Sequence, residues 1–187
     1  MYFGQSSCGD GISGFRKMHN IKPFLAAAIL ILLSGCAEQP YSIVTEPSGQ
    51  RMLLGEFPLN VLRTDTSFAG WFEKQYSAYD PAKKEMALLA GVDKNYAIVV
   101  CMGTWCSDSR REVPRFMKVM ESAGLPATSI RFFAVDHQKR SPENAAQKFN
   151  VTLVPTIIVF RAGMEIGRIT EMPEVSMEDD LGRILRK

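Results

Sequence analysis

The sequence has few of the residues that build metal sites or disulfide-linked scaffolds. Its 187 residues include four cysteines and two histidines. So few cysteines in a chain of this length do not form the dense disulfide framework of small secreted proteins. Two histidines without a cysteine cluster give no zinc-binding pattern. We therefore expect no metal and no other cofactor.

The sequence also has no large excess of positive or negative charge, because 22% of the residues are charged but the net charge is only +2. No basic block with interleaved aromatic residues occurs, which argues against a nucleic-acid partner. With 46% hydrophobic residues, the chain has enough apolar material for the core of one globular domain. We expect that domain to be a monomer.

The apolar run over residues 24–33 is too short to cross a bilayer comfortably. Basic residues precede it, as in the hydrophobic segment of a signal peptide. It ends in Leu33-Ser34-Gly35-Cys36, which resembles a bacterial lipobox, in which the cysteine is lipidated and becomes the first mature residue. The alternatives are a plain cleaved signal peptide and a short membrane anchor. The resemblance implies a protein of the bacterial cell envelope, anchored in the membrane by a lipid on Cys36.

These features predict three segments: a signal peptide with lipobox over residues 1–36, a tether over 37–50 and a folded domain over 51–187. The tether is expected because its sequence is polar, contains prolines and has no periodicity. Residues 1–17 are rich in Gly and Ser, so we expect translation to start at Met18, which would remove Cys8.

Hydrophobic periodicity predicts alternating helices and strands in the folded domain. Residues 51–64 are expected to form an edge strand or an irregular extended segment, and the aromatic residues of 67–79 form one apolar helical face that we expect to pack in the core. A short helix capped by Asp80 is expected to end near Gly91. Further strands are predicted at 96–102, 130–135, 156–160 and 165–170, and further helices at 110–123, 141–149 and 177–185.

One cysteine lies where the strand at 96–102 gives way to a helix, within Gly103-Thr104-Trp105-Cys106-Ser107-Asp108-Ser109. A thiol at a helix N-terminus meets unpaired backbone N–H groups and the positive end of the helix dipole, which favour the nucleophilic thiolate. Cys106 is therefore our candidate nucleophile. The alternative is a buried cysteine that acts as a small hydrophobic residue.

Four features of the C-terminal half resemble the thioredoxin superfamily. Trp105 directly precedes Cys106, Pro114 lies inside the following helix, Val154-Pro155-Thr156 opens a later strand, and Gly163 lies in a turn between the last two strands. The resemblance implies an α/β thioredoxin fold, with a central mixed sheet flanked by helices and, here, an N-terminal helical extension.

The same resemblance implies roles for individual residues. Pro155 matches the family's cis-proline, which holds the backbone of Val154 extended beside the thiol so that a substrate chain can pair with it. Trp105 matches the aromatic residue that shields the thiol and touches the partner, although plain packing explains it equally well. Trp105, Val154 and Pro155 are thus the candidate substrate-binding residues.

The active-site pattern departs from the family's Cys-x-x-Cys. Ser109 replaces the second, resolving cysteine, and Val100 replaces a buried carboxylate on the preceding strand. Ser109 could hydrogen-bond the Cys106 thiolate, and we leave its role open. We expect Asp108 to cap the helix by accepting backbone N–H groups. Strand alternation turns Cys101 away from the face of Val100, which predicts a buried, inert thiol.

Together these features predict a lipid-anchored thioredoxin-like protein that uses one thiol in exchange with protein or small-molecule thiols and disulfides. The alternative is a degenerate thioredoxin domain that binds a partner without catalysis. His137 is expected to be a loop residue rather than a general base, and His19 lies in the signal peptide.

Overall fold

The computed structural model describes residues 39–187. The expected signal peptide, the start at Met18 and the lipidated Cys36 lie outside these residues. Within the described part of the chain, no helix is both long and apolar enough to cross a membrane.

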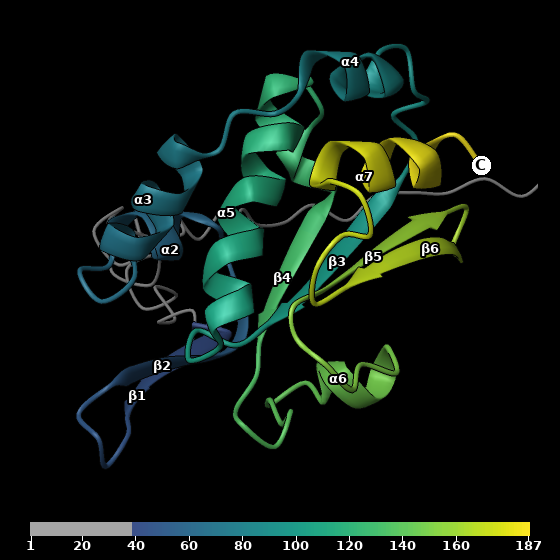
Figure 1. Cartoon of the computed structure of the whole chain (residues 1–187). Coiled ribbons are helices and arrows are strands. Elements are labelled where there is room, and N and C mark those ends of the chain that lie inside the picture. Colours follow the sequence, from purple (N-terminus) through teal and green to yellow (C-terminus); the bar gives the residue numbers. More distant parts are fainter. Residues whose placement is uncertain (1–38) are drawn as a thin grey trace, which may run out of the picture. The chain divides into compact units, whose positions relative to one another are not determined.

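A six-stranded mixed sheet forms the centre of the domain (Figure 1). Its strand order is β1-β2-β4-β3-β5-β6, in which β3 and β4 are parallel and the other neighbours are antiparallel. The strands are β1 (Tyr41–Thr45), β2 (Arg51–Phe57), β3 (Ala97–Met102), β4 (Ile130–Ala134), β5 (Thr156–Arg161) and β6 (Met164–Thr170). This sheet confirms the mixed architecture expected from the sequence.

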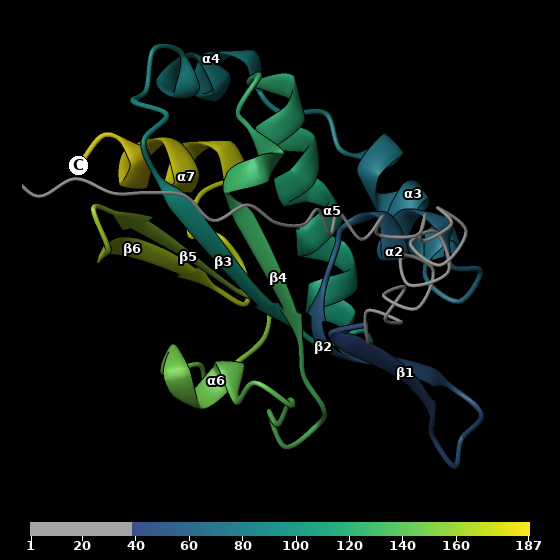
Figure 2. The ribbon, with the colours of Figure 1, turned by 180° about the vertical axis from the view of Figure 1, so that it is seen from behind.

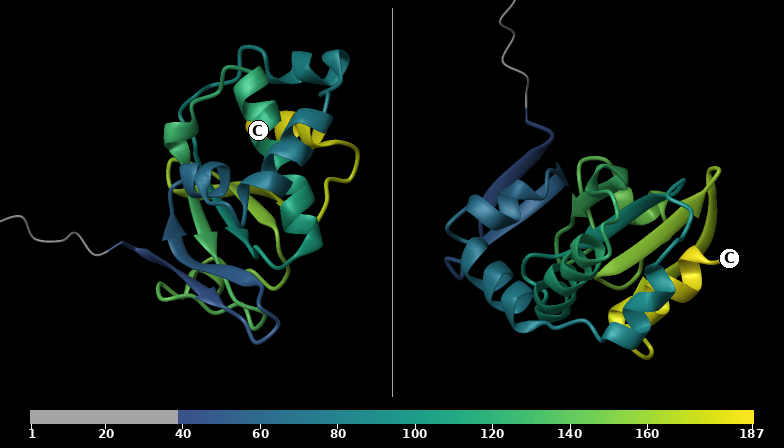
Figure 3. Two further views of the ribbon diagram at one scale, coloured as in Figure 1. Left: turned by 90° about the vertical axis from the view of Figure 1, so that its left-hand side faces the viewer. Right: turned by 90° about the horizontal axis from the view of Figure 1, so that it is seen from above.

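Helices cover both faces of the sheet (Figures 1 and 2). The helices are α2 (Asn60–Thr64), α3 (Ala69–Ala78), α4 (Lys83–Met86), α5 (Ser107–Ser122), α6 (Ala145–Lys148) and α7 (Met177–Leu185), and short 3-10 turns lie at Ala87–Leu89 and Ala127–Ser129. Residues of α2, α3, α5 and α7 share one core cluster, whereas α6 contributes to a second cluster on the other face. Figure 3 shows the sheet between these layers.

Strand β3 passes through both core clusters because its side chains alternate between the two faces of the sheet. Ile98, Val100 and Met102 lie in the larger cluster, and Val99 and Cys101 lie in the smaller one under α6. A strand that is buried on both faces has a continuous apolar sequence, and this is why the sequence predicted β3.

The aromatic face of α3 packs into the larger cluster, as expected. Phe68 and Phe72 are almost fully buried, and Trp71, Tyr76 and Tyr79 pack against the same cluster. The C-terminal helix α7 begins at its predicted cap, where the Ser176 hydroxyl accepts a hydrogen bond from the Asp179 N–H at 3.2 Å. The hairpin of β5 and β6 also turns at Ala162 and Gly163 as predicted.

The tether expected over residues 37–50 is wrong from Tyr41 onward. From Tyr41 the chain forms β1, which pairs along its whole length with β2. Strand β2 is therefore internal rather than an edge strand, with β4 as its other neighbour. Gly55 permits this arrangement, because its φ is +101° and a Cβ there would lie 2.4 Å from the Pro40 carbonyl oxygen.

Two helix starts also differ from the prediction. Helix α4 begins after Ala82 rather than at a cap on Asp80, and the Ala82 N–H donates to the buried Glu178 carboxylate at 2.8 Å. Helix α6 begins only after Asn144, which adopts a left-handed backbone conformation, so the expected helix over 141–149 keeps less than half its length.

Candidate functional site

Cys106 lies at the junction of β3 and α5, where it is the N-cap residue of the helix. Its side chain is partly buried, and it forms no disulfide within residues 39–187. The Sγ atom lies 3.2 Å from the carbonyl oxygen of Val154 and donates to it. The Val154–Pro155 peptide bond is cis, as the resemblance implied. The structure thus brings together Cys106, Val154 and Pro155 from segments far apart in the sequence.

The first turn of α5 presents backbone N–H groups beside the thiol, because the first residues of a helix have no intrahelical acceptor. No side chain caps this end. The capping role expected for Asp108 is therefore wrong: its carboxylate instead pairs with Arg111 at 2.8 Å. Arg110 donates through Nε to the Thr104 carbonyl oxygen at 2.5 Å.

Ser109 is fully buried one turn after Cys106. Its hydroxyl oxygen accepts a hydrogen bond from the Gly103 N–H at 3.1 Å, which joins the end of β3 to the start of α5. Among the described residues no hydrogen bond links Ser109 to Cys106, so the contact left open by the sequence is not formed here. The Ser109 hydroxyl has a structural partner of its own.

Cys101 is buried, and burial raises the pKa of its thiol to about 12, although the positive charge of Arg168 opposes the shift. Alternation holds, since Val100 faces the larger cluster and Cys101 the smaller one. Trp105 and Cys106, however, pack against the smaller cluster as well. The face of the sheet therefore does not separate Cys101 from the site, and the prediction of an inert thiol rests on its burial.

Trp105 is held at several points of its indole ring. Its Nε1–H donates to the Val135 carbonyl oxygen at 2.9 Å. A Cβ atom on Gly103 would lie 2.6 Å from the indole, so the close approach requires glycine there. The imidazole of His137 stacks on the ring with centroids 4.2 Å apart, and the Lys139 ammonium lies 5.1 Å from the ring centroid.

His137 is the site residue that sequence reasoning missed. It does lie in a loop, but that loop follows β4, which is parallel to β3 with Met102 opposite Ala134. The carboxyl ends of parallel neighbours meet at one edge of a sheet, so the residues after β4 adjoin those after β3. That topology was the signal that could have placed His137 beside Trp105.

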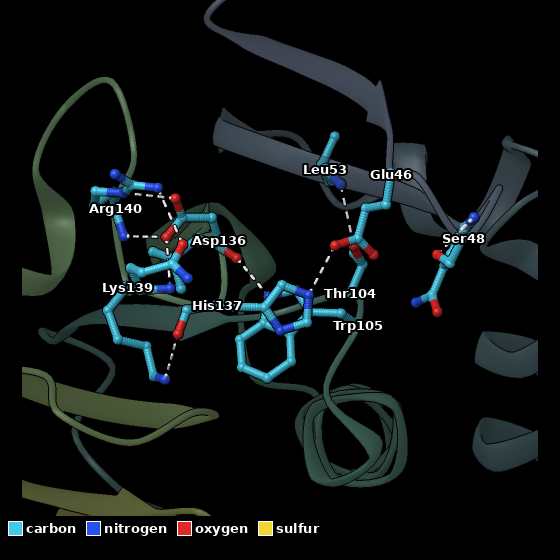
Figure 4. A network of polar contacts seen from close by, with 12 residues as sticks. Glu46, Ser48, Leu53, Thr104, Trp105, Asp136, His137, Lys139 and Arg140 are labelled. Carbon is cyan, nitrogen blue, oxygen red and sulfur yellow. Dashed lines mark hydrogen bonds and ion pairs between the residues drawn. The ribbon is translucent and has the colours of Figure 1, made fainter.

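The hairpin of β1 and β2 reaches the same edge of the sheet (Figure 4). The Leu53 N–H donates to the Thr104 hydroxyl at 3.1 Å, and the Glu46 carboxylate lies 2.8 Å from Nε2 of His137. Within residues 39–187 no group of three or more His, Cys, Asp or Glu side chains is placed to hold a metal ion. The site offers one partly buried thiol, a backbone acceptor and a fixed indole.

Residues 83–185 match the family model of thioredoxin. The chain belongs to the thioredoxin family. No curated protein matches it.

Similar solved structures include a Pseudomonas aeruginosa protein of unknown function, at 16% identity and a TM-score of 0.44 over 63% of this chain and 79% of that one. Fasciola hepatica thioredoxin is 24% identical, with a TM-score of 0.31 over 42% of this chain and 69% of that one. Arabidopsis thaliana thioredoxin O2 is 21% identical, with a TM-score of 0.32 over 45% of this chain and 71% of that one.

Proposed function

We propose that this thioredoxin-family protein carries out thiol–disulfide exchange with Cys106 as its only active-site thiol. The observation that carries the proposal is the position of Cys106: partly buried at the open N-terminus of α5, with its Sγ atom 3.2 Å from the Val154 carbonyl oxygen. The first turn of α5 leaves backbone N–H groups without intrahelical acceptors beside this thiol. Cys101 cannot substitute readily, because it is fully buried and its pKa is raised to about 12.

A single thiol can take part in two successive exchange steps. The Cys106 thiolate attacks one sulfur of a substrate disulfide, forms a mixed disulfide with it and expels the other sulfur as a thiolate. An external thiolate then attacks the substrate sulfur of the mixed disulfide, which forms a new disulfide with the substrate and releases the Cys106 thiolate. Ser109 cannot perform this second attack, so a dissolved thiol or a second protein must supply it.

The proposed substrate-binding residues are Trp105, which is partly exposed, and Val154 and Pro155, which are buried and would take part through their backbone. The Val154 carbonyl points at the thiol, and Leu153 beside it is 45% exposed, which leaves this edge of the site open to a partner. An extended polypeptide could pair with the backbone before Pro155 while its disulfide approaches Cys106. Protein disulfides and small-molecule disulfides are both within this substrate class.

We also propose that the protein works in the bacterial cell envelope, anchored by a lipid on Cys36. The lipobox-like Leu33-Ser34-Gly35-Cys36 after an apolar run supports this location. Disulfide exchange is chemically reasonable there, since the envelope lies outside the reducing cytosol.

The test compares the Cys101 and Cys106 thiols in the folded, full-length protein. Brief iodoacetamide treatment over a pH series, followed by mass spectrometry, should modify Cys106 well before Cys101. Incubation with a peptide disulfide should then give a mixed disulfide in the wild type and in Cys101→Ser, but not in Cys106→Ser. Failure of Cys106 to react with iodoacetamide or with the disulfide would favour a thioredoxin domain that binds without exchange.

A further inference from the structure

The hairpin of β1 and β2 contacts the active-site loop because β4 is too short to pair with all of β2. Pairing between β2 and β4 ends at Gly55 opposite Ala134. The buried Leu53 lies beyond that point, and its N–H turns instead to the hydroxyl of the buried Thr104. The residue before Trp105 is thereby fixed to the hairpin.

A second contact comes from the turn of the hairpin. Glu46 follows β1 directly, and its backbone closes the turn through hydrogen bonds to Gln50 and Gly49 at 2.8 Å each. The Glu46 carboxylate lies 2.8 Å from Nε2 of His137, and only 18% of this side chain is exposed. The imidazole, which is 48% exposed, therefore has a fixed partner on the hairpin (Figure 4).

We infer that His137, held by Glu46, is a positioning residue that keeps the Trp105 indole in place beside Cys106. The indole N–H donates to Val135, the missing side chain of Gly103 leaves room for the ring edge, and the imidazole stacks on the ring, near which the Lys139 ammonium also lies. The first two involve residues that directly follow β4 and β3. The third depends on the hairpin of β1 and β2. The hairpin therefore helps to determine the position of the Trp105 indole, which a partner of Cys106 would contact.

Removing the His137 side chain should change both the quenching of Trp105 fluorescence and the rate of mixed-disulfide formation. The second of these measurements rests on the proposed exchange function. Trp71→Phe leaves Trp105 as the only tryptophan. In that background, His137→Ala should increase acrylamide quenching of Trp105 fluorescence. It should also slow mixed-disulfide formation with a peptide disulfide by about 2- to 10-fold, the size of a lost aromatic stacking contact. A small disulfide such as hydroxyethyl disulfide should react at nearly the wild-type rate.

Further variants separate positioning from a general loss of stability. His137→Phe keeps a ring on Trp105 and should restore most of its protection from acrylamide. Glu46→Ala should act in the same direction as His137→Ala but only about 2- to 5-fold, because a single hydrogen bond to a half-exposed imidazole contributes little. The double variant should equal His137→Ala alone, since Glu46 acts through His137. Glu56→Gln, which removes the ion pair of the hairpin with Arg131, is the matched control.

Unchanged quenching and an unchanged peptide rate in His137→Ala would overturn the inference. Additive effects of Glu46→Ala and His137→Ala would refute the link between the two residues. If the wild type forms no mixed disulfide with either substrate, the proposed exchange function is lost, but the fluorescence comparison still decides whether His137 positions Trp105.

Discussion

Replacing Ser109 with cysteine should convert the one-thiol site into a two-thiol site. Ser109 lies one helical turn after Cys106 and is buried at the start of α5. A sulfur at this position comes from the same side of the helix as the Cys106 side chain, which favours an internal disulfide. We expect Ser109→Cys to form that disulfide and to gain reductase activity with dithiothreitol as electron donor.

The structure sets the size of two opposing effects on the free energy of unfolding. In the reduced variant, sulfur is a weak acceptor, so the buried Gly103 N–H loses the hydrogen bond it donates to Ser109, at a cost of about 1 to 3 kcal/mol. In the oxidised variant, closing a loop of roughly four residues restores about 2 kcal/mol in the chain-entropy model. The oxidised variant should therefore be close to the wild type in stability, and the reduced variant clearly weaker.

The assay combines urea unfolding with turnover of a disulfide substrate. Ser122→Cys, which places a new thiol at the far end of the same helix, is the matched control and should gain neither a disulfide nor activity. Activity of Ser109→Cys should still be slow, because Val100 supplies no buried base. The reasoning fails if Ser109→Cys remains reduced under oxidising conditions. It also fails if the wild type alone is a reductase whose activity disappears in Cys101→Ser, since Cys101 would then be the resolving thiol.

Three further variants test other parts of the structure. The Cys101 thiol has its ordinary pKa of 9.0 in the unfolded chain and a pKa of about 12 in the folded one, so its stabilising contribution is present below pH 9 and is lost as the pH rises toward 12. Between about pH 8 and about pH 10.5, the free energy of unfolding measured in urea should therefore fall more in the wild type than in Cys101→Ala. Thr104→Val should lower the free energy of unfolding by about 1 to 3 kcal/mol because the Leu53 N–H loses its buried acceptor, whereas the exposed Thr152→Val should change it little; equal effects would contradict this role. Labelled fatty acid should enter the wild type but not Cys36→Ser, and label in the mutant would remove the lipid anchor.

Sequence patterns identified the elements whose signal is local. The continuous apolar run of β3 marks a strand buried on both faces, and the aromatic spacing of α3 marks a helix with one buried face. The Ala162-Gly163 turn marks a hairpin. Each of these signals lies within one element, so no knowledge of the rest of the fold was needed.

The hairpin and its contacts carried no such local signal. Strand β1 is short and lies between Pro40 and Pro47, so its apolar residues looked like part of a polar tether. Its stability comes from pairing with β2 and from packing of Tyr41 and Ile43 against the core, which are contacts between separate segments. The contact between Glu46 and His137 depends on this hairpin, so it could not be predicted while β1 was missing.

Val100 and Ser109 make sense together in a one-thiol site. Val100 is fully buried in the larger core cluster, where an unpaired carboxylate would cost several kcal/mol or would stay protonated. Such a cost is justified when the carboxylate serves as a base for a second thiol. With a hydroxyl at position 109, that base has no thiol proton to take, and an apolar residue at position 100 stabilises the core instead. Under the proposed exchange function, in which a partner of Cys106 supplies the resolving thiol, the two departures from the family pattern thus have one physical explanation.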